Sequence, residues 1–159
     1  MEERIALFPG SFDPITKGHE SIVERALPMF DKIVVAVGCN TAKHSFFSLE
    51  KRIEWLKRTF EKQPKVEVVT FNSLTVDFCR EIGAKYILRG LRNSADFQYE
   101  RNIARINQEL AEEIETVFLM TKPDDAAISS SLVREILSFG GDVSKFIPSS
   151  IRIDAKEVK

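Results

Sequence analysis

A segment near the amino terminus combines two glycines, several hydroxyl groups and a histidine. Residues 9–19 read PGSFDPITKGH and follow a short apolar run. Gly10 permits a tight turn and a close approach of a ligand to the backbone. A helix predicted to begin after Gly18 would offer free N–H groups and a partial positive charge to an anion. The segment indicates a phosphate site beside His19, and the alternative is a turn in which the histidine only caps or packs.

Two further segments carry groups that bind phosphate. Residues 89–92 read RGLR, and the guanidinium groups of Arg89 and Arg92 could each donate paired N–H groups to phosphate oxygens. Two solvated surface charges would give the same pattern. Residues 128–131 read ISSS and open a predicted helix. A cap needs one serine, so three hydroxyls beside free helix N–H groups indicate a second anion site.

Two single residues have less distinctive surroundings. Lys43 lies in the loop Thr41-Ala42-Lys43-His44 and could neutralise charge on a transferring phosphoryl group, or be an exposed loop lysine. We expect His44 at the surface. Glu100, near the start of a long predicted helix, could help to hold a nucleotide or be a solvated helix charge, and residue chemistry leaves both open.

The composition restricts the class of protein. The 159 residues carry 23 basic and 24 acidic side chains, a net charge of −1, which gives no general attraction to nucleic acid or to an anionic membrane. Cys39 and Cys79 have no partners at metal-binding spacing. No apolar run approaches the roughly 20 residues of a membrane span. We therefore expect a cytoplasmic protein with reduced thiols, no nucleic-acid or membrane partner, and no metal held by protein ligands.

Short apolar runs alternate with helical patterns along the chain. The predicted strands are Ile5–Phe8, Ile33–Val37, Val66–Phe71, Tyr86–Leu88 and Thr116–Met120. This alternation predicts an α/β fold, a Rossmann-like open sheet of about five parallel strands with helices on both faces, and residues 1–159 as a single domain. The tail after Pro148 is expected to be a short surface helix or a frayed end. Ligands of such sheets bind beyond the carboxyl ends of the strands, where the segments above lie.

Three strings together resemble the phosphopantetheine adenylyltransferases, within the (H/T)xGH nucleotidyltransferase superfamily. They are PGSFDPITKGH (9–19), LRGLRNSADFQYE (88–100) and ISSSLVREI (128–136), and the resemblance covers nearly the whole chain. It implies reversible adenylyl transfer from ATP to 4′-phosphopantetheine, giving dephospho-coenzyme A and pyrophosphate, the penultimate step of coenzyme A synthesis. It also implies Mg²⁺ carried with ATP, a homohexamer, and feedback binding of coenzyme A.

The resemblance implies residue roles by position. His19 would stabilise the transition state, with Lys43 and Arg92 as further catalytic residues. Contacts to ATP would come from Ser11, Phe12, His19, Gly90, Leu91, Arg92, Glu100, Asp125, Ala126, Ala127, Ile128, Ser129, Ser130 and Ser131. Contacts to 4′-phosphopantetheine would come from Ser11, Lys43, Thr75 and Arg89. Thr75 departs from the larger apolar residue common at its position, and residues 125–127 lack an aromatic side chain that some members carry.

The chemistry of this transfer agrees with the residues available. A phosphate monoester is largely dianionic at neutral pH, so it can attack without a general base. The enzyme must align it with the α-phosphate and stabilise the spreading charge. We expect in-line attack, with His19 donating a hydrogen bond to an α-phosphate oxygen. The alternatives are another acceptor, such as nicotinate mononucleotide or glycerol 3-phosphate, and a nucleotide sensor without catalysis.

Overall fold

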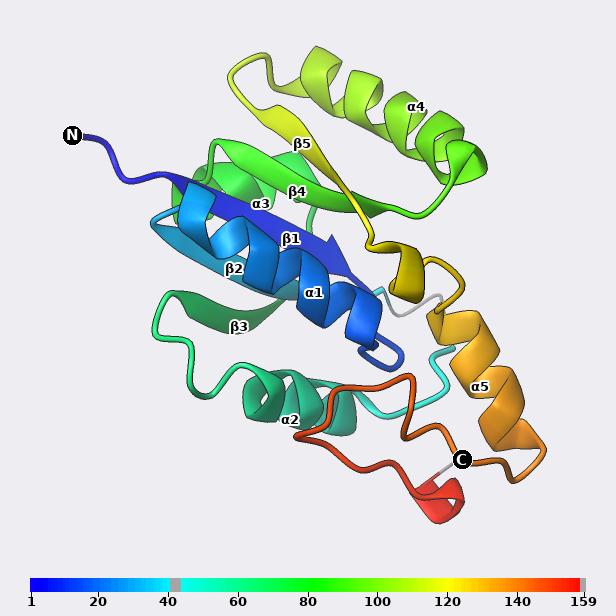
Figure 1. Ribbon diagram of the computed structural model, residues 1–159. Helices are drawn as coiled ribbons and strands as arrows, with labels where there is room; N and C mark the ends of the chain where they lie inside the picture. The colour runs from blue at the N-terminus through cyan, green and yellow to red at the C-terminus, as the bar shows by residue number, and fades with distance from the viewer. Residues whose placement is uncertain (41–43, 158–159) are drawn as a thin grey trace.

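A five-stranded parallel sheet forms the centre of the molecule (Figure 1). The computed structural model describes residues 1–40 and 44–157. The strands are β1 (Ile5–Gly10), β2 (Lys32–Gly38), β3 (Val66–Phe71), β4 (Tyr86–Leu91) and β5 (Glu115–Met120). Their order in the sheet is β3-β2-β1-β4-β5, and every neighbouring pair is parallel. The predicted α/β sheet is confirmed, and the strand order reverses between β1 and β4, where such sheets bind ligands.

Helices cover both faces of the sheet (Figure 1). The α-helices are α1 (Lys17–Ala26), α2 (Leu49–Thr59), α3 (Thr75–Ile82), α4 (Ser94–Leu110) and α5 (Ser130–Ser138), and the short 3-10 helices are η1 (Leu27–Met29), η2 (Pro123–Asp125) and η3 (Ala155–Glu157). Among the described residues, no helix is both long and apolar enough to cross a membrane.

Each face of the sheet has its own apolar core. On one face, Ile22 of α1, Trp55 of α2 and Val133 of α5 pack against buried side chains of β1, β2 and β4. On the other face, Val76 and Cys79 of α3 pack against alternate residues of the same strands. The central strands are therefore apolar on both sides, as strands buried between two helical layers require.

Two segments differ from what the sequence indicates. The helical spacing of Ile103, Ile106, Leu110 and Ile114 indicates a helix that reaches Ile114, but α4 ends at Leu110. Ile114 is buried in the turn that leads into β5, and its N–H donates to the Ala111 carbonyl. The tail after Pro148 does end in the short helix η3, yet Ile151 before it is buried in the core. That segment is thus part of the packed molecule.

Candidate active site

A cavity of about 340 Å³ lies at the carboxyl end of the strands, between the loop after β1, the end of β4 and the start of α5. Most residues predicted to contact a nucleotide line it: Ser11, Phe12, His19, Gly90, Arg92, Glu100, Ile128, Ser129, Ser130 and Ser131. Leu91 is buried in β4, and residues 125–127 lie outside the cavity wall. Lys43 falls outside the described residues, and its role stays a prediction.

A second cavity, of about 290 Å³, adjoins the first. The two share a wall made of Pro9, Gly10, Ser11, Arg89 and Glu100. Beyond that wall the second cavity is lined by Thr75 at the start of α3, by apolar side chains that include Phe71 and Ile103, and by Asn107. The structure thus gathers Ser11, Thr75 and Arg89, three of the four residues predicted to bind phosphopantetheine, around one space.

The loop after β1 is held by groups that the sequence did not single out. The Asp13 carboxylate accepts the backbone N–H groups of Phe46 and Phe47 at 2.7 and 2.9 Å. The Arg134 guanidinium donates to the Asp13 carbonyl at 2.8 Å and also lines the first cavity. Phe12 adopts a φ of 45°, in the left-handed region that a bulky residue rarely occupies. Contacts from outside the loop therefore maintain its conformation.

Phe12 supports the loop from inside the molecule. Its ring is 3% exposed and packs edge-on against Phe8 and His19, with ring centroids 5.4 and 5.0 Å apart. A Cβ atom at Gly10 would lie 3.1 Å from this ring, so a larger residue at position 10 would displace it. Phe12 thus lines the cavity and at the same time fixes the plane of the His19 ring.

The imidazole of His19 has a fixed orientation and tautomer. Helix α1 begins at Lys17, two residues earlier than expected, because the Thr16 side chain caps it. His19 stands where a capping box usually has Glu or Gln, and its Nδ1 accepts the Thr16 N–H at 3.0 Å. Since Nδ1 accepts that bond, the proton of the neutral ring resides on Nε2. Nε2 is then a hydrogen-bond donor.

The surroundings of His19 also keep the ring uncharged. Burial, together with the smaller effect of the positive charges of Arg89 and Arg92, lowers the pKa of His19 to about 4. At neutral pH the ring is therefore a neutral donor. It cannot serve as a general base there, because its only free nitrogen lone pair already accepts the Thr16 N–H.

We expect the His19 ring to remain neutral from about pH 5.5 upward, since its pKa is about 4. The chain has two histidines, so in a His44→Gln variant the imidazole NMR signals belong to His19 alone. Their shifts should not move between about pH 5.5 and 8. The unfolded chain takes up this proton near pH 6.5, so stability falls by up to about 3 kcal/mol as the pH drops from 6.5 toward 4. A titration midpoint between about pH 6 and 7 would contradict the expectation.

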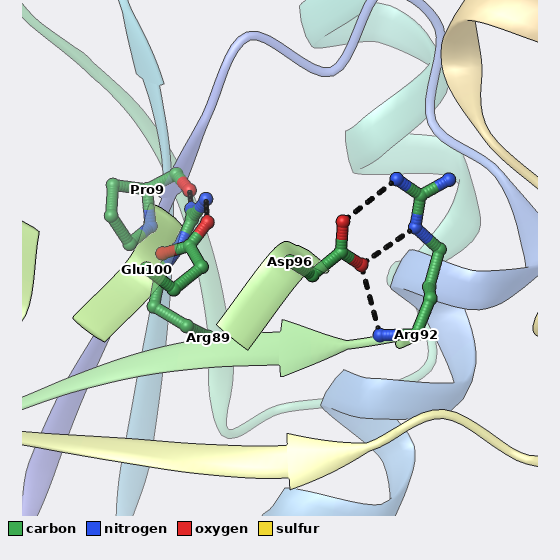
Figure 2. Close-up of polar contacts among 5 residues, drawn as sticks. All are labelled: Pro9, Arg89, Arg92, Asp96 and Glu100. Atoms are coloured by element: carbon green, nitrogen blue, oxygen red, sulfur yellow. Dashed lines mark hydrogen bonds and ion pairs between the residues drawn. The ribbon is translucent and has the colours of Figure 1, made fainter. Parts of the chain in front are cut away.

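Two arginines near the cavity are each held by a carboxylate of α4 (Figure 2). The Arg89 guanidinium donates to both carboxylate oxygens of Glu100, at 2.8 and 2.6 Å, and to the Pro9 carbonyl. Arg92 donates to Asp96 through its backbone N–H, Nε and Nη2, at 3.0, 3.0 and 3.2 Å. Glu100 thus orients Arg89. Asp96 was not predicted, although its position four residues after Arg92 on a helix start was a usable signal.

The three serines line the first cavity and also have partners within the chain. Ser129 caps α5 by accepting the Leu132 N–H, Ser130 donates to the Pro14 carbonyl, and the Ser131 hydroxyl accepts from Arg134. The capping interpretation is therefore confirmed for Ser129, and the anion site at this helix start stays a prediction. Within residues 1–40 and 44–157, no group of three or more His, Cys, Asp or Glu side chains could hold a metal ion.

The architecture is shared with solved nucleotidyltransferases. A protein from Vibrio parahaemolyticus assigned as a nicotinate-nucleotide adenylyltransferase superposes with a TM-score of 0.70 at 18% identity, over 94% of this chain and 96% of that one. A bifunctional NMN adenylyltransferase/ADP ribose pyrophosphatase from Francisella tularensis also gives 0.70, at 16% identity, over 94% of this chain and 46% of that one. At these identities the likeness concerns the fold alone.

Comparison of sequences identifies the family, which the likeness of fold does not. The cytidylyltransferase-like family model matches residues 7–136. A phosphopantetheine adenylyltransferase from Cytophaga hutchinsonii is 50% identical over 148 residues, which cover 93% of this chain and 99% of that protein. Another, from Nautilia profundicola, is 52% identical over 146 residues, which cover 92% and 95%. The chain therefore belongs to the cytidylyltransferase-like family and, within it, to the phosphopantetheine adenylyltransferases.

Proposed function

We propose that the two adjoining cavities carry out reversible adenylyl transfer from ATP to 4′-phosphopantetheine, giving dephospho-coenzyme A and pyrophosphate. The observation that carries this proposal is their shared wall, where Ser11 and Arg89 face both spaces. ATP would occupy the larger cavity, between His19 and the serines of α5. The pantetheine arm would lie in the second cavity, with its phosphate at the wall. The phosphate of 4′-phosphopantetheine and the α-phosphate of ATP would then meet at that wall.

The mechanism is in-line displacement without a general base. The phosphate dianion attacks the α-phosphorus of ATP, one P–O bond forms, and the bond to pyrophosphate breaks. The Nε2–H of His19 donates to an α-phosphate oxygen, where negative charge increases in the transition state. Arg89 orients the attacking phosphate, and Arg92 with the start of α5 takes the charge of the leaving pyrophosphate.

The pantetheine arm matches the chemistry of the second cavity. The arm alternates short apolar stretches with amide groups. Phe71 and Ile103 offer apolar surface to it, and Asn107 and Thr75 offer hydrogen-bonding groups. A larger apolar residue is common at the position of Thr75 in the family. Thr75 is smaller and more polar, so it would give the arm a hydroxyl contact in place of apolar packing.

We also propose that Mg²⁺ arrives bound to the phosphates of ATP. The two carboxylates that the described residues place in the wall of the first cavity, Asp96 and Glu100, are both engaged by arginines, so this wall offers the ion no carboxylate cage. Phosphate oxygens and water would hold it. Its charge would offset part of the negative charge of the triphosphate.

A pyrophosphate-release assay tests the proposed reaction. With ATP present, 4′-phosphopantetheine should give turnover, whereas nicotinate mononucleotide and glycerol 3-phosphate should not. Turnover with one of the latter acceptors alone would overturn the choice of acceptor. ATP binding without pyrophosphate release under any condition would instead indicate a nucleotide sensor.

Lys43→Ala is expected to raise the KM for 4′-phosphopantetheine or lower kcat, by about 10- to 100-fold in kcat/KM, since a charge-assisted hydrogen bond to phosphate is lost. The support for this role is positional, because Asn40 and His44 on either side of the loop line one cavity together with Ser11. Lys62→Ala, an exposed residue after α2, is the matched control. Unchanged steady-state kinetics in Lys43→Ala would remove the residue from the site.

We further propose a homohexamer in the cytoplasm, inhibited by coenzyme A. Helix α4 exposes a stripe of apolar side chains with helical spacing, formed by Tyr99, Ile106 and Leu110. Such a stripe is typical of a surface covered by another protein, here further copies of the chain. Coenzyme A carries the same pantetheine arm as the product and would compete for both cavities. Light scattering on the native chain measures the assembly directly.

A further inference from the structure

Arg52 of α2 is a buried cation whose observed partners are neutral. The residue is 7% exposed. Its Nη1 donates to the Ser11 carbonyl at 2.8 Å and its Nη2 to the Ser45 hydroxyl at 3.3 Å. Among the described residues it has no ion-pair partner, and its buried Nε has no hydrogen-bond partner. A buried charge without a counter-charge lowers stability. A neutral side chain of similar length would avoid that cost, so stability alone does not account for this arginine.

The carbonyl that Arg52 holds lies next to the strained backbone of Phe12. Ser11 lines both substrate cavities and a third space of about 630 Å³ that Arg52 also lines. The peptide between Ser11 and Phe12 is also the one whose rotation sets the φ of Phe12, observed at 45°. This backbone conformation is unfavourable for a bulky residue. A donor fixed on the Ser11 carbonyl resists relaxation of that peptide.

The second partner connects Arg52 to the neighbouring loop. The Ser45 hydroxyl that accepts from Arg52 donates in turn to the Phe47 carbonyl at 2.8 Å. Phe47 is fully buried, and its ring packs edge-on against Trp55 with centroids 4.8 Å apart. Arg52 therefore joins the loop after β1 to a segment anchored in the core. Because Arg52 donates to both segments, the Ser11 peptide has little freedom to move.

We propose that Arg52 is a positioning residue for adenylyl transfer, acting through the Ser11 carbonyl to place the Ser11 hydroxyl between the two substrates. The inference rests on the proposed function, in which Ser11 contacts both ATP and the pantetheine phosphate. Reactions that depend on alignment are sensitive to such placement, because a displacement of about 1 Å can cost about 100-fold in rate.

Steady-state kinetics of three variants test the proposal. Arg52→Gln should lower kcat by about 10- to 100-fold while its melting curve shows a folded protein at the assay temperature. Arg52→Lys should recover part of the loss, since its ammonium group can still reach one of the two acceptors. Arg58→Gln, on the exposed side of α2 and ion-paired with Glu54, is the matched control and should behave as wild type. A purely structural role would lower the melting temperature and leave kcat per folded site unchanged, which would overturn the proposal.

A double-mutant cycle with Ser11→Ala identifies the route of the effect. If Arg52 acts through Ser11, the double variant should match the slower single variant within about two-fold. If the losses in kcat of the two single variants multiply in the double variant, Arg52 and Ser11 act independently, which would overturn the proposal. Wild-type kinetics in Ser11→Ala would show that the Ser11 hydroxyl makes no important substrate contact. The Arg52 proposal, which depends on that contact, would then be rejected as well. A slow Ser11→Ala beside a fully active Arg52→Gln would overturn the Arg52 proposal alone. If Arg52→Gln does not fold, the same cycle is run with Arg52→Lys.

Discussion

His19→Asn is expected to lower kcat by about 10²- to 10³-fold, the usual cost of removing one preorganised donor to a developing oxyanion. The KM for ATP should change little, because the lost bond strengthens mainly in the transition state. His19→Ala should show the same loss in kcat, with an added cost in stability. The Thr16 N–H would then have no acceptor at the first turn of α1. Pyrophosphate-release kinetics and melting curves separate these two effects.

The asparagine variant provides the sharper test. Its short side chain can still accept a hydrogen bond at the helix start, but it carries no donor in the place of Nε2. His44→Asn, at an exposed histidine, is the matched control and should keep wild-type kinetics. Undiminished turnover in a folded His19→Asn enzyme would refute the role of His19 in the transition state.

Arg89→Met is expected to have the second-largest effect, on both stability and activity. It leaves the Glu100 carboxylate, 7% exposed, without its guanidinium partner. Removing one member of a buried ion pair costs about 3 kcal/mol or more, since the remaining charge is uncompensated. The wall between the two cavities would also lose its phosphate-binding group. Urea unfolding should show the loss of stability, and the KM for 4′-phosphopantetheine should rise by at least about 10-fold.

The double variant Arg89→Met/Glu100→Gln separates the two consequences. Neutralising the carboxylate should restore most of the lost free energy of unfolding, whereas catalysis should stay impaired because the phosphate contact is still absent. Arg80→Met is the matched control, because Arg80 pairs with Glu113 at the exposed surface and its loss should change unfolding little. Recovery of activity in the double variant would show that Arg89 acts through stability alone.

The strand positions were predictable because both faces of the central strands are buried. Continuous apolar runs such as Ile33–Val37 have few other interpretations when turn residues bound them. The edge strand Val66–Phe71 was located as well, and its extent in the structure is the same. The position of the phosphate-binding segments was predictable for the same reason. Each follows a predicted strand, and a parallel sheet brings the carboxyl ends of its strands together.

Contacts between distant segments were not predictable in the same way. Arg134 reaches the Asp13 carbonyl across 121 positions, and Arg52 reaches Ser11 across 41. No local spacing encodes such pairs. Glu100 lies eleven positions from Arg89, across the turn from strand to helix, so its role as an orienting carboxylate also required the structure. Sequence patterns identified groups that can bind phosphate, and the structure adds those that hold them in place.

The hydrogen bond from the Thr16 N–H to His19 has a consequence for inhibitor design. Because this bond leaves Nε2 as the donor, a compound placed beside the ring should present an acceptor, such as a carbonyl, sulfonyl or nitrile group, at that point. An ammonium or amide N–H would face another N–H and lose affinity. Since the ring stays neutral down to weakly acid pH, this preference should not change between compartments or assay buffers near neutrality.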